Sequence, residues 1–184
     1  MTTTPDATTP TPAFGGERAD LLESLSKARF FLRLTTKAMT DEQARLRSTV
    51  SQLTLGGIIK HVTDAEERWT RFMLGQSGGP HGVGPEGPSA ETIAEWEESM
   101  QMRPGETLTG LLERYGAVAA VTDAAIASLP DLDVSYPLPP APWFEPGAQW
   151  SARRVLLHLV AETAQHAGHA DVIRESIDGQ KSMG

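Results

Sequence analysis

The 184-residue chain contains no cysteine. This absence excludes a disulfide framework, a cysteine-based zinc site and a cysteine nucleophile. If the protein carries out thiol chemistry, the thiol must come from another molecule. The chain also lacks an apolar run near the ~20 residues of a transmembrane helix, and its N-terminus lacks the charged and then apolar layout of a secretion signal. These absences predict a cytoplasmic protein with no membrane partner.

Basic clusters are equally scarce. The formal net charge is −8, and no group of Lys and Arg with interleaved aromatic residues stands out. Proteins that bind nucleic acid usually present a basic patch, so we expect no nucleic-acid partner. Hydrophobic residues make up 39% and charged residues 22% of the chain, which is typical of one globular domain with a full core.

Hydrophobic residues recur at three- and four-residue spacing in four long segments. This pattern predicts helices over about residues 17–38, 54–74, 107–129 and 151–177. Thr40 and Gln43 form a predicted capping box, Ser151 is a predicted N-cap, and Gly179 a predicted helix end. A short acidic helix is expected over 89–100, packed by Trp96. No segment alternates polar and apolar residues, so the sequence predicts an all-α four-helix bundle.

Two long connections join the second helix to the third and the third to the fourth. Residues 75–88 are rich in Gly and Pro, and loops of this length are usually mobile or functional. The sequence leaves open whether this loop closes over a site. Residues 131–149 contain five prolines, which disfavour both a helix and a central strand, yet their aromatic residues predict that the segment folds back onto the bundle. We assign residues 1–16 to a disordered tail, 17–179 to the domain and 180–184 to a C-terminal tail.

The last predicted helix carries three of the five histidines, His158, His166 and His169. Each residue of an α-helix advances by about 100°, so His158, Glu162 and His166 fall within about 80° of one another. His169 returns to the same stripe. Apolar residues lie on or beside this stripe, which predicts that it faces the core. Burying a carboxylate and imidazoles there costs energy unless they are paired or bind a metal ion.

Glu162 and His166 are spaced so that both side chains can hold one ion. His61 is the candidate third ligand because it is the one histidine in the other predicted helices. His158 and His169 remain alternatives, either as the third ligand, as groups that orient the ligands, or as solvated residues. Three protein ligands and a water form the usual catalytic zinc site. The simpler interpretation is a hydrogen bond between Glu162 and His166 on a helix surface.

Several other residues have structural interpretations. Trp69, Phe72, Tyr115 and Trp96 are more typical of a core than of a substrate pocket, and His81 in the 75–88 loop is more typical of a solvated residue. Gly56 and Gly57 weaken the start of their helix and therefore predict close packing or a backbone approach there. Asp171, Arg174 and Glu175 are expected to form a solvated, ion-paired face, with Arg174 as a possible contact for an anionic group.

Two segments carry a family resemblance that covers about residues 17–179. Residues 53–69, which include His61, resemble the second helix of the DinB-like superfamily. Residues 161–179 resemble the C-terminal signature of its actinobacterial branch, once known as a domain of unknown function. The resemblance implies a four-helix bundle with a divalent ion held by His61 and by a pair in the last helix. Most members use two histidines there. This chain has Glu162 and His166, and so is similar to mycothiol-dependent maleylpyruvate isomerases, whose zinc site is His/Glu/His.

The resemblance also implies an activity. Characterised members are S-transferases and isomerases that use small thiols, such as mycothiol or bacillithiol. It predicts a divalent-metal-dependent S-transferase with zinc, or alternatively Ni²⁺ or Mn²⁺, acting on a thiol and an electrophile. His169 and His158 are the predicted catalytic neighbours, and Arg174 the predicted contact to the thiol. The alternatives are a metal-dependent hydrolase or isomerase, and a non-enzymatic metal-binding or interaction bundle. A homodimer remains open, as do the identities of the thiol and the electrophile.

Overall fold

The computed structural model describes residues 16–80, 82–84 and 86–182. The predicted N-terminal tail lies outside this range except for Gly16, and His81 and residues 183–184 also lie outside it. The first predicted helix begins at Glu17, as expected, and the last ends at Asp178. Within the described residues, no helix is long and apolar enough to cross a membrane.

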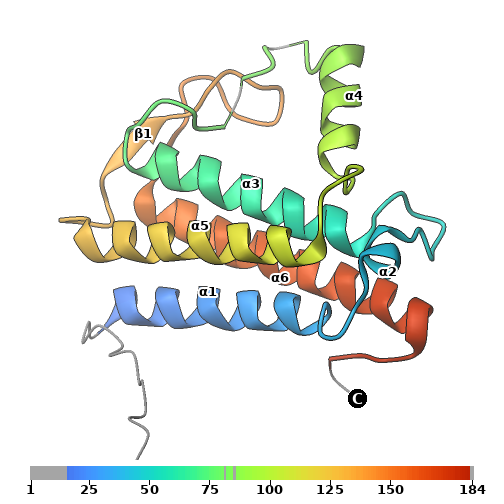
Figure 1. Cartoon of the computed structure of the whole chain (residues 1–184). Helices are drawn as coiled ribbons and strands as arrows, with labels where there is room; N and C mark the ends of the chain where they lie inside the picture. The colour runs from blue at the N-terminus through green and yellow to red at the C-terminus, as the bar shows by residue number, and fades with distance from the viewer. Residues whose placement is uncertain (1–15, 81, 85, 183–184) are drawn as a thin grey trace, which may run out of the picture.

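Four long helices form the body of the molecule (Figure 1). They are α1 (Glu17–Leu34), α3 (Leu55–Met73), α5 (Leu108–Ser128) and α6 (Ala152–Asp178). Helix α6 packs against both α1 and α3, while α5 packs mainly against α3. The predicted all-α four-helix bundle is therefore confirmed. Its long connections join α3 to α5 and α5 to α6, as the sequence predicted.

The helix boundaries follow local capping signals. The hydroxyls of Thr54, Thr107 and Ser151 each accept a backbone N–H in the first turn of α3, α5 and α6. Thr40 and Gln43 form the predicted capping box of α2 (Asp41–Arg45). Gly179 ends α6 in the left-handed conformation, at φ 77°, which favours glycine because it has no Cβ.

Helix α1 ends at Leu34, four residues before the predicted end at Ala38. The hydroxyls of Thr35 and Thr36 donate to the carbonyls of Leu32 and Arg33. These local hydrogen bonds compete with the helical ladder, and residues 35–38 form a turn instead.

The core consists of two apolar clusters at opposite ends of the bundle. One joins the start of α1 and α6 to the end of α3 and α5, and the other joins the end of α1 and α6 to the start of α3 and α5. This division means that α3 and α6 run antiparallel, with the start of α3 beside the end of α6. Polar groups lie between the clusters, and they include the predicted site.

Helix α4 (Ala90–Ser99) stands apart from the bundle (Figure 1). The expectation that Trp96 packs it onto the bundle is wrong. None of its residues is buried, and Trp96 remains 41% exposed. The indole instead faces Trp143 of the 131–149 connection, with ring centroids 6.4 Å apart.

The 131–149 connection does fold back onto the body, as predicted. Phe144 and the following Trp150 pack against the first apolar cluster. The prediction missed a short antiparallel ribbon of β1 (Ser135–Pro137) and β2 (Gln149–Ser151). Proline is tolerated here because Pro137 ends its strand and the ribbon has only two strands. The two long connections also meet, since Val83 and Gly84 donate backbone N–H groups to the Pro140 carbonyl.

Candidate metal centre

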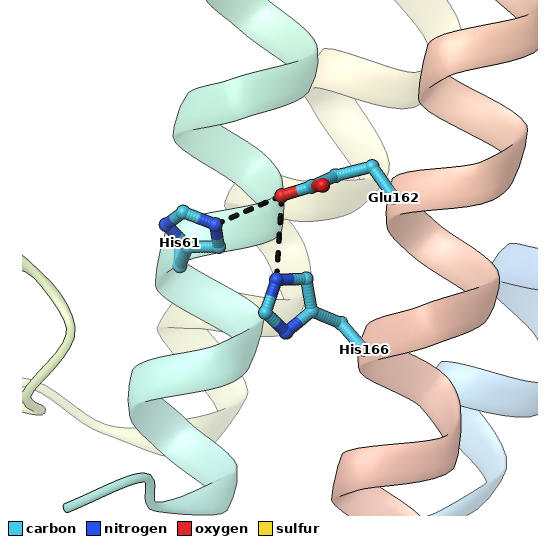
Figure 2. Close-up of side chains that lie close together, drawn as sticks. All are labelled: His61, Glu162 and His166. Atoms are coloured by element: carbon cyan, nitrogen blue, oxygen red, sulfur yellow. Dashed lines mark hydrogen bonds and ion pairs between the residues drawn. The ribbon is translucent and has the colours of Figure 1, made fainter. Parts of the chain in front are cut away.

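The predicted ligands lie together in the seam between α3 and α6 (Figure 2). His61 projects from the middle of α3, and Glu162 and His166 project from adjacent turns of α6. The antiparallel packing of the two helices brings residues about 100 positions apart in sequence to the same level. Among the described residues, these three form the one cluster of His, Cys, Asp or Glu able to hold a metal ion.

One carboxylate oxygen joins the three side chains. Glu162 Oε1 lies 3.0 Å from His61 Nε2 and 3.3 Å from His166 Nε2. Hydrogen bonds from His166 and His61 hold the pKa of Glu162 well below its usual range. The side chains are 23%, 21% and 11% exposed for His61, Glu162 and His166. The cluster is therefore partly exposed to solvent.

The geometry fits a divalent ion. The three donor atoms lie within 4.8 Å of one another. Ligands at the usual zinc distances of 2.0–2.1 Å, placed at tetrahedral angles, would be about 3.3 Å apart. The two distances to Glu162 Oε1 are close to this separation. Two imidazole nitrogens and one carboxylate oxygen are also donors that zinc accepts, and three protein ligands leave a fourth position open.

The residues after α4 pack closely against the first turns of α3, near His61. A Cβ on residue 57 would lie 1.7 Å from the Met100 carbonyl oxygen, so only glycine fits there. This contact confirms the close backbone approach predicted from the glycines. Lys60, next to His61, donates to Glu106 at 3.0 Å and to the Gln101 carbonyl at 3.3 Å. These contacts hold the start of the α4–α5 connection beside the centre, and sequence reasoning missed them.

The two other helical histidines flank the ligands along α6. The His169 ring is exposed and lies edge-on to His166, with centroids 5.3 Å apart. His158 lies one turn before Glu162, against the rings of Trp69 and Trp150 at 4.9 and 5.3 Å. Burial lowers the pKa of His158. Neither histidine belongs to the three-residue cluster.

The aromatic residues around His158 pack closely against one another. Trp69 and Trp150 stack with their centroids 4.7 Å apart, and the Arg154 guanidinium lies 4.1 Å from the Trp150 ring centre. Trp69 and Phe72 are buried, as expected for core residues, and Tyr115 is fully buried.

Arg174 is placed differently from the prediction. The expectation of a solvated face is wrong for this residue, because Arg174 is buried. Its guanidinium donates to the carbonyls of Thr35 and Lys37, each at 2.8 Å, and to Asp178. It lies eight residues, or about 12 Å of helix rise, beyond His166. Arg174 thus links the segment after α1 to α6, and it does not belong to the three-residue cluster.

A similar fold occurs in a solved structure, the crystal structure of a conserved protein from Enterococcus faecalis. The TM-score is 0.67 at 13% identity, and the match covers 91% of this chain and 100% of that chain. At this identity the likeness concerns the fold alone. No curated protein matches the chain. A sequence model of the mycothiol S-transferase family matches residues 20–179, in agreement with the predicted DinB-like resemblance, and the chain therefore belongs to the mycothiol S-transferase family.

Proposed function

We propose that the protein is a divalent-metal-dependent S-transferase that transfers a small, mycothiol-like thiol to an electrophile. His61, Glu162 and His166 hold the ion, which we propose to be zinc. The observation that carries this proposal is the convergence of two imidazole nitrogens on one Glu162 oxygen, in a chain that belongs to a thiol-transferase family. The lack of cysteine agrees with a nucleophile supplied by a second molecule.

His61, Glu162 and His166 would hold the ion, and zinc bound there would favour the deprotonated, nucleophilic form of a coordinating thiol. The ligands of this chain set the charge at that position. Glu162 contributes one negative charge, and the two imidazoles must be neutral to bind a metal ion. The site is therefore one unit less positive than a site of three histidines. Its partial exposure lets the thiol and the electrophile reach it from solvent.

The transfer itself balances without an oxidant or reductant. The sulfur of the thiol forms a bond to an electrophilic carbon, and the electron pair of the broken bond leaves with the displaced group or moves onto a conjugated acceptor. The thiol proton passes to a base. We propose His158 and His169 for this role. Burial lowers the pKa of His158 and so favours its neutral imidazole, while His169 is exposed to solvent.

Metal analysis of the purified protein tests the ligand set. We expect about one zinc per chain in the wild type, and loss of the metal in His61→Ala and His166→Ala. The matched control is His169→Ala, which removes a histidine from the same helix and should retain the metal. Retention of metal in both ligand variants would contradict the three-residue site.

A conjugation assay tests the transferase activity. Mycothiol and monochlorobimane form a fluorescent product in which a carbon–sulfur bond replaces the carbon–chlorine bond. We expect the zinc-loaded protein to accelerate this reaction above the rate of the metal-stripped protein, and His166→Ala to remain at the background rate. A zinc-loaded protein that conjugates no candidate thiol above background would refute the transferase proposal.

A further inference from the structure

Two arginines of the long helices, Arg68 of α3 and Arg154 of α6, have no carboxylate or carbonyl partner among the described residues. Every other arginine in α1, α3, α5 and α6 donates a hydrogen bond to a carboxylate or to a backbone carbonyl. Acidic partners are not scarce, since the chain has 24 acidic residues and 16 Lys and Arg. The two guanidinium groups are therefore available to an anion from outside the protein.

Both arginines lie on the helix faces that carry the predicted metal ligands. Arg68 follows His61 by seven residues, which is about 20° short of two turns and about 10.5 Å along α3. Arg154 precedes Glu162 by eight residues, which is about 80° past two turns and about 12 Å along α6. Because α3 and α6 run antiparallel, with the end of α3 beside the start of α6, both arginines lie toward the same end of the seam.

Ring contacts connect this end of the seam to the metal centre. The His158 ring, one turn before Glu162, lies 4.9 Å from the Trp69 ring and 5.3 Å from the Trp150 ring. The Arg154 guanidinium lies 4.1 Å from the Trp150 ring centre. Burial lowers the pKa of His158, the Glu162 charge acts in the opposite direction, and the Arg154 charge adds to the lowering. The charge of Arg154 therefore acts on a residue beside the predicted ligands.

The contact between Arg154 and Trp150 suits the binding of a carboxylate. A guanidinium stacks on aromatic faces and presents its N–H groups in a planar fork that matches a carboxylate. The indole of Trp150 supports the guanidinium, and no group of the described chain occupies its donors. Arg154 is exposed and Arg68 is half-buried, so a solute reaches the first from solvent, and the second binds an anion in a partly desolvated position.

We propose that Arg68 and Arg154 form a subsite for an anionic group, best matched by a carboxylate, on the electrophilic substrate. In the proposed function the sulfur holds the thiol at the metal, whereas the electrophile needs another group to bind and orient it. The arginines lie about 10.5 and 12 Å along their helices from the ligands, a span that one aromatic ring and an arginine side chain together cover. This inference rests on the proposed function, since it names the class of electrophile.

Conjugation of mycothiol to a matched pair of electrophiles, 4-(bromomethyl)benzoate and 4-(bromomethyl)benzamide, tests the subsite. In both reactions a carbon–sulfur bond replaces the carbon–bromine bond, bromide leaves with the electron pair, and the thiol proton passes to solvent. We expect zinc-loaded wild type to have a kcat/KM about tenfold or more higher for the benzoate, as for a hydrogen bond to a charged group. Arg68→Met and Arg154→Met should each lose most of this preference. Arg154→Lys, which keeps the charge without the planar fork, should lose less.

Arg153 provides a matched control. It is adjacent to Arg154, but its guanidinium pairs with Glu17 and Asp133. We expect Arg153→Met to keep the preference for the benzoate within about twofold of the wild type. The KM for mycothiol should stay within about twofold in Arg68→Met and Arg154→Met. A higher KM for mycothiol in these variants, with an unchanged preference between the electrophiles, would overturn the proposal, because the arginines would then bind the thiol.

A binding measurement on the metal-free protein separates the subsite from the transferase activity. Tryptophan fluorescence reports the binding of the unreactive 4-methylbenzoate, since Trp150 lies against Arg154. We expect the acid to bind about tenfold or more tightly than 4-methylbenzamide, and the difference to disappear in the double variant Arg68→Met with Arg154→Met. If the wild type binds and conjugates acid and amide equally well, the subsite is refuted and the proposed function stands. If the acid binds as expected but neither electrophile is conjugated above background, the proposed function fails and the anion site stands.

Discussion

Two polar groups interrupt the apolar core, and both include a residue of α3. The first is the ion pair of Arg29 and Glu66, and the second is the triad of His61, Glu162 and His166. Glu66 is fully buried and accepts hydrogen bonds from both Nε and Nη2 of Arg29. The remaining guanidinium nitrogen donates to Asp123 at 2.8 Å. In the triad, by contrast, two imidazoles share one carboxylate oxygen, and all three side chains stay partly exposed.

The difference between the two groups separates a structural from a functional arrangement. The charges of Arg29 and Glu66 satisfy each other inside the protein, and each of the three guanidinium nitrogens of Arg29 donates to a carboxylate. The triad brings three metal-binding atoms together, and its side chains are partly exposed to solvent. Burial of charged groups alone would have favoured the Arg29–Glu66 pair as the site. The donor set and the accessibility favour the triad.

Removal of Glu66 should have the largest effect on stability. Glu66→Ala leaves Arg29 buried without its main partner, and breaking a buried pair in this way typically costs about 3–5 kcal/mol. We expect this loss in the free energy of unfolding, measured with urea. Replacing both residues, as in Arg29→Met with Glu66→Leu, should recover most of it. A loss below about 1 kcal/mol in Glu66→Ala would show that the pair is not the closed structural unit described above.

Acid should release the metal while leaving the fold intact. Histidine binds metal ions only when neutral, and its ordinary pKa is about 6.5, so zinc affinity should fall as the pH drops through about 6 to 5. Glu162 does not cause this loss. Its pKa is lowered by His166 and His61, so its stabilising effect is present above the ordinary carboxyl pKa of about 4.3 and is lost only below it. Equilibrium dialysis across this range measures the effect, and full zinc retention at pH ~4.5 would argue against histidine ligation.

Glu162→Gln should have the smallest effect on the fold. The carboxylate is partly exposed, and ion pairs of this kind contribute about 0–1 kcal/mol. We therefore expect the metal-free variant to unfold at nearly the wild-type urea concentration. Its zinc affinity should nevertheless fall, because the charged ligand is gone. Wild-type zinc affinity in this variant would place the metal elsewhere. A large loss of stability would show that Glu162, like Glu66, serves mainly to stabilise the fold.

The sequence predicted those features that depend on local patterns. The spacing of hydrophobic residues made the bundle predictable, and Thr40 and Ser151 cap their helices, as predicted, through neighbours three residues away. Glu162 and His166 are one turn apart, which made the pair visible. His61 was the one histidine in the other predicted helices, and the family resemblance implied the same ligand. The packing of α3 against α6 brings the three together, while their role as metal ligands remains a prediction.

The missed features depend on contacts between distant residues. Arg29 and Glu66 are 37 positions apart, and nothing in either helix marks them as partners. The carbonyls of Thr35 and Lys37, which accept hydrogen bonds from buried Arg174, are more than 130 positions away from it in the sequence. The β1–β2 ribbon pairs residues across a proline-rich segment without an alternating pattern. Such contacts follow from the packed bundle and leave no periodic signal in the chain.

The most direct test of the central claim is a crystal structure of the zinc-loaded protein with anomalous data collected at the zinc edge. The account predicts one strong peak between α3 and α6, about 2.0–2.2 Å from His61 Nε2, a Glu162 oxygen and His166 Nε2. A zinc-loaded crystal with no peak at this position, or with the peak bound by a different set of residues, would contradict it.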